Sequence, residues 1–76
     1  MSSHREFELE KEKIDFLLEQ DYVISGVTEN LSGSFLEFSY EGHDPAKDEK
    51  QRLHVLHPDT RKYFSTILLQ QQKQQK

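Results

Sequence analysis

Apolar and polar residues alternate along this chain with two periods, which predict helices at both ends and strands between them. Residues 4–20 place apolar side chains on one face of a helix, because these residues recur at intervals of three and four. The stripe consists of Phe7, Ile14, Leu17 and Leu18, and it is widened by Leu9 and Phe16. The same spacing returns in Tyr63, Phe64, Ile67 and Leu68, which predicts a second helix over about 59–70.

The middle of the chain has the period of two that is typical of half-buried strands. Residues 22–29 and 34–41 alternate in this way, and the turn residues 30–33 between them predict a hairpin. After a polar loop, residues 51–57 resume as a third strand. This strand ends at Pro58, because proline lacks the N–H group that a sheet ladder needs.

The order of these elements predicts an α+β fold of the form α-β-β-β-α. The connections between strands are too short for parallel crossovers, so we expect a three-stranded antiparallel meander packed against two helices. Residues 1–70 are expected to form a single small α+β domain. Residues 71–76, which contain only Gln and Lys, are predicted to be a disordered polar tail.

Composition narrows the setting in which this domain works. Hydrophobic residues make up 33% of the 76-residue chain and charged residues 32%, and there is no cysteine. Without cysteine the chain has no disulfides and no thiolate metal sites, which favours a cytoplasmic location over secretion. The first residues lack the apolar core of a signal peptide, and no segment approaches the roughly 20 apolar residues of a membrane span. We therefore expect no membrane association.

The stretch LHVLHPDT, residues 53–60, places two histidines and an aspartate close together, as a metal or catalytic site would. On a strand, however, side chains alternate, so His54 and His57 point to opposite faces. Asp59 after Pro58 is interpreted as the N-cap of the second helix. The stretch is therefore predicted to be a strand-to-helix junction.

Other arrangements of reactive residues do not indicate catalysis either. The three glycines match no phosphate-binding loop, and no serine lies in a context that would activate it. Carboxylate pairs such as Glu10 and Glu12 are interpreted as solubilising surface charge. We predict no enzyme activity, no catalytic residue, no metal site and no cofactor.

Binding to another protein is the predicted function. A small sheet leaves edge strands that a partner can extend. Strict alternation places Tyr22, Ile24, Gly26 and Thr28 on one face of the first strand, and Val23 and Val27 on the other. If the helices cover the face of Leu36 and Phe38, the opposite face carries a partner-binding surface of Val23, Val27, Phe35 and Leu56. The partner is another protein or a second copy in a homodimer, and a regulator, an adaptor or an accessory subunit would all use such a surface.

The alternative prediction is a nucleic-acid-binding module that uses the basic C-terminal third. Residues 1–21 carry three basic and seven acidic groups, residues 22–46 carry four acidic groups, and residues 47–76 carry seven basic and three acidic groups. Four of the basic residues are candidates for phosphate contacts: Lys50, Arg52, Arg61 and Lys62. The acidic first half opposes this function because it repels phosphates. Arg61 and Lys62 are unusual at the start of a helix, which favours anions.

Overall fold

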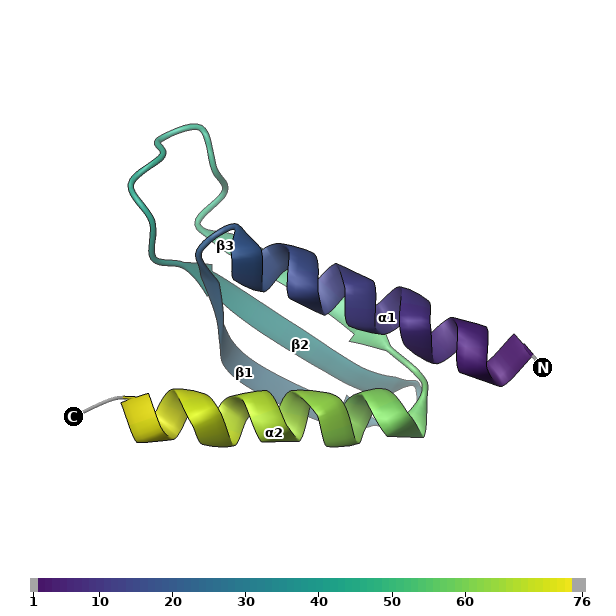
Figure 1. Cartoon of the computed structure of the whole chain (residues 1–76). Helices are drawn as coiled ribbons and strands as arrows, with labels where there is room; N and C mark the ends of the chain where they lie inside the picture. Colours follow the sequence, from purple (N-terminus) through teal and green to yellow (C-terminus); the bar gives the residue numbers. More distant parts are fainter. Residues whose placement is uncertain (1, 75–76) are drawn as a thin grey trace.

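The structure, a computed structural model, describes residues 2–74 and confirms the predicted α-β-β-β-α order of an α+β fold (Figure 1). Its elements are α1 (Ser2–Glu19), β1 (Tyr22–Asn30), β2 (Gly33–Tyr40), β3 (Lys50–Val55) and α2 (Pro58–Gln74). Helix α2 extends further than the predicted range of 59–70. The predicted polar tail, 71–76, therefore begins inside this helix, and residues 75–76 lie outside the described residues.

The three strands form the predicted antiparallel meander, in the order β1-β2-β3. Both helices lie on the same face of this sheet, with α1 nearer β3 and α2 nearer β1 (Figure 1). Within residues 2–74 no helix covers the opposite face, which we call the open face. The loop between β2 and β3 projects beyond the end of the sheet (Figure 1).

The core lies between the sheet and the two helices, and every helix and strand contributes to it. Its buried apolar residues are Ile14, Tyr22, Ile24, Leu36, Phe38, Val55 and Phe64. Burying each of these side chains contributes roughly 1.5–3 kcal/mol. Because so few residues carry the core, single polar contacts that fix the helices matter for the stability of this fold.

A polar cluster joins the two helices above the core. The Asp15 carboxylate accepts hydrogen bonds from the Tyr63 hydroxyl on α2 and, at 2.9 Å, from the Lys11 ammonium one turn away on α1. Burial, followed by the hydrogen bond to Asp15, raises the pKa of the Tyr63 hydroxyl. The same carboxylate raises the pKa of Lys11, mainly through their hydrogen bond. Near neutral pH, both Lys11 and Tyr63 therefore carry the protons that these bonds need.

Strand β1 contains a β-bulge that the alternation of apolar and polar residues did not predict. Ile24 lies opposite Phe38 and Gly26 lies opposite Glu37, so Ser25 is an extra residue on β1. Its hydroxyl donates a hydrogen bond of 3.2 Å to the carbonyl of Glu37. The extra residue ends strict alternation in the middle of the strand.

Beyond the bulge, the side chains exchange faces relative to the prediction. Val27 lies opposite the fully buried Leu36, whereas Thr28 lies opposite Phe35. Directly paired residues of antiparallel strands share a face, so Val27 lies on the helix side and Thr28 on the open face. The predicted placement of Val27 and Val23 on one face is wrong for this reason, as is the placement of Thr28 on the helix side.

Candidate functional site

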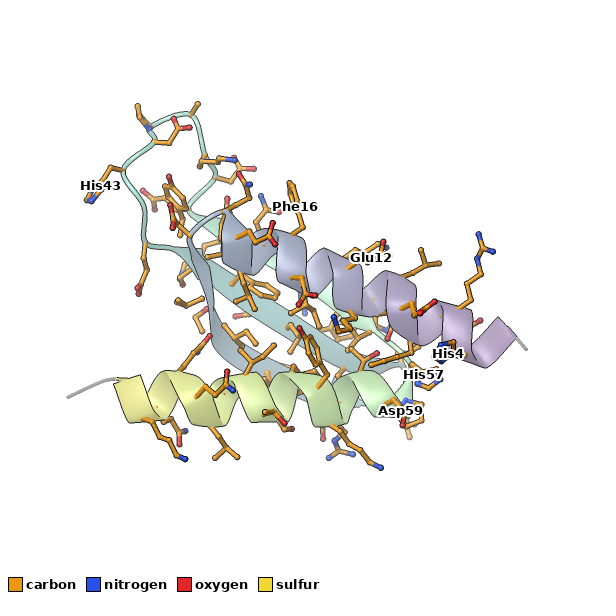
Figure 2. The ribbon with its side chains drawn as sticks, in the orientation of Figure 1. His4, Glu12, Phe16, His43, His57 and Asp59 are labelled. Carbon is orange, nitrogen blue, oxygen red and sulfur yellow. The ribbon has the colours of Figure 1, made fainter. Side chains whose placement is uncertain are left out.

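The structure separates the two histidines of the stretch LHVLHPDT. His54 lies on the open face, where its ring stacks on the ring of Phe35 with 4.3 Å between their centres. His57 follows β3 and packs near Phe7, with 5.8 Å between ring centres. Figure 2 places His43 on the projecting loop, far from His57. Among residues 2–74, no group of three or more His, Cys, Asp or Glu side chains is arranged to hold a metal ion.

His57 is the residue that caps α2. Its Nδ1 accepts a hydrogen bond of 3.0 Å from the backbone N–H of Asp59, and its carbonyl accepts one of 3.1 Å from the N–H of Thr60. The helix begins at Pro58, so Asp59 is the second helical residue. The prediction that Asp59 is the N-cap is therefore wrong, although its charge suits the first turn.

Glu10 of α1 holds this junction in place. Its carboxylate accepts hydrogen bonds from the backbone N–H groups of Leu56 and His57, at 2.8 and 3.2 Å, and from the hydroxyl of the fully buried Thr60. The interpretation of Glu10 as solubilising charge is wrong, whereas Glu12 is exposed. Sequence reasoning missed this role because the bonded residues lie 46–50 positions away from Glu10 along the chain.

The four predicted basic residues lie in two separate places. Lys50 and Arg52 lie on the open face, opposite Ser39 and Glu37 of β2. The Lys50 ammonium donates a 2.9 Å hydrogen bond to the Ser39 hydroxyl, and the Arg52 guanidinium lies 4.6 Å from the centre of the Phe35 ring. These two cations therefore do not share a face of the molecule with those of α2.

Arg61 and Lys62 are exposed in the first turns of α2. The guanidinium of Arg61 contacts both carboxylate oxygens of Glu29 on β1, each at 2.8 Å. This ion pair explains why a basic residue is tolerated at the start of a helix that favours anions. It also means that Arg61 already has an anionic partner within the chain.

The predicted apolar surface is also divided. Val23 and Phe35 lie on the open face, opposite Ser39 and Thr28 respectively. Val27 lies on the helix side of the sheet. Leu56 follows the last residue of β3 and is 69% exposed. The four residues do not form the continuous partner surface that the sequence suggested.

The β1 edge of the sheet is covered by a side chain of α2. Gln71 accepts a 3.0 Å hydrogen bond from the N–H of Ile24 through Oε1, and donates one of 3.1 Å to the carbonyl of Ile24 through Nε2. The amide group thus bonds to β1 as the peptide group of a neighbouring strand would. Gln71 and the bulge at Ser25 together oppose the addition of another strand here.

The β3 edge is different. Tyr40 donates a backbone hydrogen bond of 2.9 Å to the carbonyl of Glu49. Tyr40 and Glu49 are therefore a hydrogen-bonded pair, which determines which of the following pairs between β2 and β3 are hydrogen-bonded. Because bonded and non-bonded pairs alternate, Lys50, Arg52 and His54 direct their N–H and C=O groups away from β2. None of the side chains that the structure describes, those of residues 4–73, is bonded to these backbone groups, and we call them the open β3 edge.

An apolar groove lies directly beside this edge, between α1 and β3. Its volume is about 390 Å³. It is lined by Leu9, Glu12, Lys13, Phe16, Leu17, Gln51 and Leu53, and we call it the α1–β3 groove. Leu9 is 48% exposed and Phe16 is 58% exposed, and Figure 2 shows Phe16 on the side of α1 away from α2. The sequence had placed both residues at the margin of the helical stripe, but not beside an open strand.

Comparisons with known proteins do not identify a function for this chain. No family model, no curated protein and no solved structure matches the chain. A search of the described helices for a bilayer-spanning segment finds none of sufficient length and apolar character. The open β3 edge and the α1–β3 groove are therefore the features on which a functional proposal rests.

Proposed function

We propose that this chain is a non-catalytic protein-binding module that accepts an extended segment of a partner protein as a fourth strand beside β3. The observation that carries the proposal is the open β3 edge next to the α1–β3 groove. An added strand would bond to the backbone of Lys50, Arg52 and His54. Every second side chain would then enter the groove beneath Leu9 and Phe16, which is the usual division of roles in strand addition.

The exposure of the apolar residues in the groove is explained better by partner binding than by a role in stabilising the fold. Phe16 and Leu9 lie about half in solvent, so they contribute only part of the free energy that burial of such side chains supplies. A partner strand would remove more of their surface from water. Backbone hydrogen bonds contribute roughly 0.5–1.5 kcal/mol each, so a short strand together with this apolar contact fits a micromolar affinity.

A partner protein fits the edge better than a second copy of this chain. Pairing β3 with β3 of another copy would place the exposed cations Lys50 and Arg52 beside the same cations, and like charges across strands are destabilising. Charged residues on an edge strand are a known means of preventing such self-association. The absence of cysteine fits a reducing compartment, so we propose that the module works in the cytoplasm.

The second candidate function is binding of single-stranded nucleic acid on the open face. It is favoured by the position of Lys50 and Arg52 beside the aromatic ring of Phe35. Against it, the Phe35 ring already contacts His54 and Arg52, and Glu37 lies between the cations and β1. Fluorescence anisotropy with a single-stranded oligonucleotide at low salt tests it: a shift that Arg52→Glu abolishes would favour nucleic acid.

The proposed function can be tested with a displayed library of nine-residue peptides. Alternate positions of these peptides carry apolar residues, and the remaining positions are fully randomised. We expect selected peptides to bind and to protect the backbone amides of Lys50, Arg52 and His54 from hydrogen exchange, measured by NMR. Protection is expected at these amides because they would bond to the peptide. Selected peptides that instead protect β1 or leave β3 unprotected would contradict the proposal.

A matched pair of variants shows whether the groove is the binding site. Phe16→Ser should weaken peptide binding at least tenfold, whereas Leu69→Ser, at a 60% exposed residue of α2, should leave binding unchanged. Both substitutions should change the free energy of unfolding by less than about 1 kcal/mol, because both sites are exposed. Equal losses of binding in the two variants would contradict a site in the groove. A concentration-dependent dimer that occupies β3 in sedimentation experiments would identify a second copy as the occupant instead.

A further inference from the structure

Resting on the proposed function, we infer that the segment accepted by β3 is acidic: it carries Asp or Glu at the positions beside Lys50 and Arg52, and apolar residues between them. The outward and inward sides of the open β3 edge differ in chemistry, and each side specifies one half of this pattern. The inference thus defines the class of partner that fits the module.

On the open face, β3 presents a basic row. Its cations are Lys50 and Arg52, and His54 continues the same alternation. All three side chains are exposed, and Nε2 of His54 lies 2.5 Å from the carbonyl oxygen of Ser32. Within residues 2–74, neither Lys50 nor Arg52 forms an ion pair, in contrast to Arg61, which is paired with Glu29. Side chains of an added strand would lie about 5 Å from this row, measured between Cβ atoms. Carboxylates at these positions would give Lys50 and Arg52 the anionic partners that they lack within the described chain.

Glu37 is the acidic residue that faces the row from within the sheet, and Glu10 bonds to the backbone of Leu56 just beyond the end of β3. Glu37 on β2 is directly opposite Arg52, so it offsets part of the positive charge toward the centre of the sheet. On the outer side of β3 the described chain has no further strand. The charges of Lys50 and Arg52 therefore border the position that a fourth strand would take. A second copy of this chain, or a lysine-rich segment, would place further cations at this position, and like charges across strands are destabilising.

The groove specifies the other half of the pattern. Leu53 faces it from β3, while Leu9, Phe16 and Leu17 face it from α1. Glu12 and Lys13 also line it, and their opposite charges give the groove no net charge. Inward side chains of an added strand would therefore meet mainly apolar surface, where burying a charge costs free energy. Alternation of acidic and apolar residues is the sequence that fits both sides.

Three peptides of equal length and equal alternation test the inference. Each contains four repeats of a dipeptide: Glu-Val, Ser-Val or Lys-Val. We expect the Glu-Val peptide to bind at least about tenfold more tightly than the Ser-Val peptide, measured by fluorescence anisotropy at about 50 mM salt, and the Lys-Val peptide to bind most weakly. Raising the salt to about 500 mM should remove most of the difference between the Glu-Val and Ser-Val peptides, because it screens exposed charges.

A charge-reversed pair of variants separates the local basic row from the net charge of the protein. Lys50→Glu should weaken binding of the Glu-Val peptide about tenfold and strengthen binding of the Lys-Val peptide, whereas Lys62→Glu on α2 should change neither. Thermal unfolding of both variants checks that each is folded. Equal effects of the two substitutions would show that only net charge matters, and would overturn the inference.

The outcomes distinguish this inference from the function on which it rests. If the three peptides bind with equal affinity and protect the amides of β3, the acidic specification is overturned and the proposed function stands. If none of them binds and the displayed library also yields no peptide that protects β3, the proposed function fails, and the inference fails with it. Tighter binding of the Lys-Val peptide than of the Glu-Val peptide would overturn the inference alone.

Discussion

The two edges of the sheet present the same kind of backbone groups to their surroundings, yet the fold treats them in opposite ways. The β1 edge is bulged at Ser25, lies beside α2 and has the N–H and C=O of Ile24 bonded to Gln71. The β3 edge is regular and lies beside an apolar groove, and none of the described side chains is bonded to the backbone groups of Lys50, Arg52 and His54. Closing one edge while leaving the other accessible restricts strand addition to one side of the sheet.

The helices account for this asymmetry. Helix α2 runs along β1, so polar residues near its C-terminal end reach the strand (Figure 1). Helix α1 lies nearer β3, and Leu9 and Phe16 line the groove there instead of closing the edge. A covered edge protects the module from aggregation, and an accessible edge beside apolar residues suits recognition.

The largest effect on stability should come from Glu10→Ala. The substitution leaves the N–H groups of Leu56 and His57 and the buried hydroxyl of Thr60 without their acceptor, which should lower the free energy of unfolding by about 2–4 kcal/mol. Because Glu10 ties the end of β3 to α1, the groove should also lose its shape. Chemical denaturation measures the first effect, and hydrogen exchange of β3 measures the second.

Glu12→Ala is the matched control for this experiment, because Glu12 is an exposed carboxylate on the same helix. Its effect on stability should be below about 0.5 kcal/mol. A similar loss of stability in the two variants would mean that the three hydrogen bonds of Glu10 do not fix the junction between β3 and α2.

Gln71→Ala should affect stability less, but it should change the difference between the two sheet edges more. The variant loses two hydrogen bonds to Ile24, which should lower the free energy of unfolding by about 1 kcal/mol, since water can replace part of them. The amide of Ile24 should exchange faster, and the β1 edge should become accessible. Gln72→Ala on the exposed side of the same helix should change neither quantity.

Sedimentation of the Gln71→Ala variant gives an independent measurement. An uncovered β1 edge lacks the row of cations that opposes self-pairing at β3, so this variant should associate at high concentration while the unmodified chain does not. Unchanged exchange at Ile24 together with unchanged association would show that the bulge, rather than Gln71, keeps β1 closed.

The sequence predicted the parts of the fold that depend on local patterns. The periods of apolar residues were sufficient for the element order and the meander, and the clean alternation around Leu36 and Phe38 assigned β2 to the correct face. The same reasoning failed at Ser25, because one extra residue changes every later face assignment on the strand. The signal that was available is Gly26, since a glycine inside a strand pattern often marks a bulge.

The candidate site was less accessible to sequence reasoning, because it is built from distant residues. Glu10 has the composition of a solvated helix face, and only the folded chain brings it to Leu56 and Thr60. Gln71 lies in a low-complexity polar segment, yet its amide group can replace a peptide group at a sheet edge. The α1–β3 groove depends on where α1 crosses the sheet, which no local pattern specifies.

The smallest expected effect concerns the ion pair between Arg61 and Glu29, which also joins α2 to β1. Both side chains are substantially exposed, so Arg61→Ala should lower the free energy of unfolding by only about 0.5 kcal/mol or less, and added salt should reduce this further. Lys62→Ala at the neighbouring exposed position is the control and should have no larger effect.

The β1 edge should stay closed in the Arg61 variant, with unchanged hydrogen exchange at Ile24, because Gln71 still bonds to that residue. If Arg61→Ala instead exposed Ile24 more than Gln71→Ala does, the closure of β1 would depend on the position of the whole helix. The contrast between the two edges would then come from helix placement rather than from one glutamine side chain.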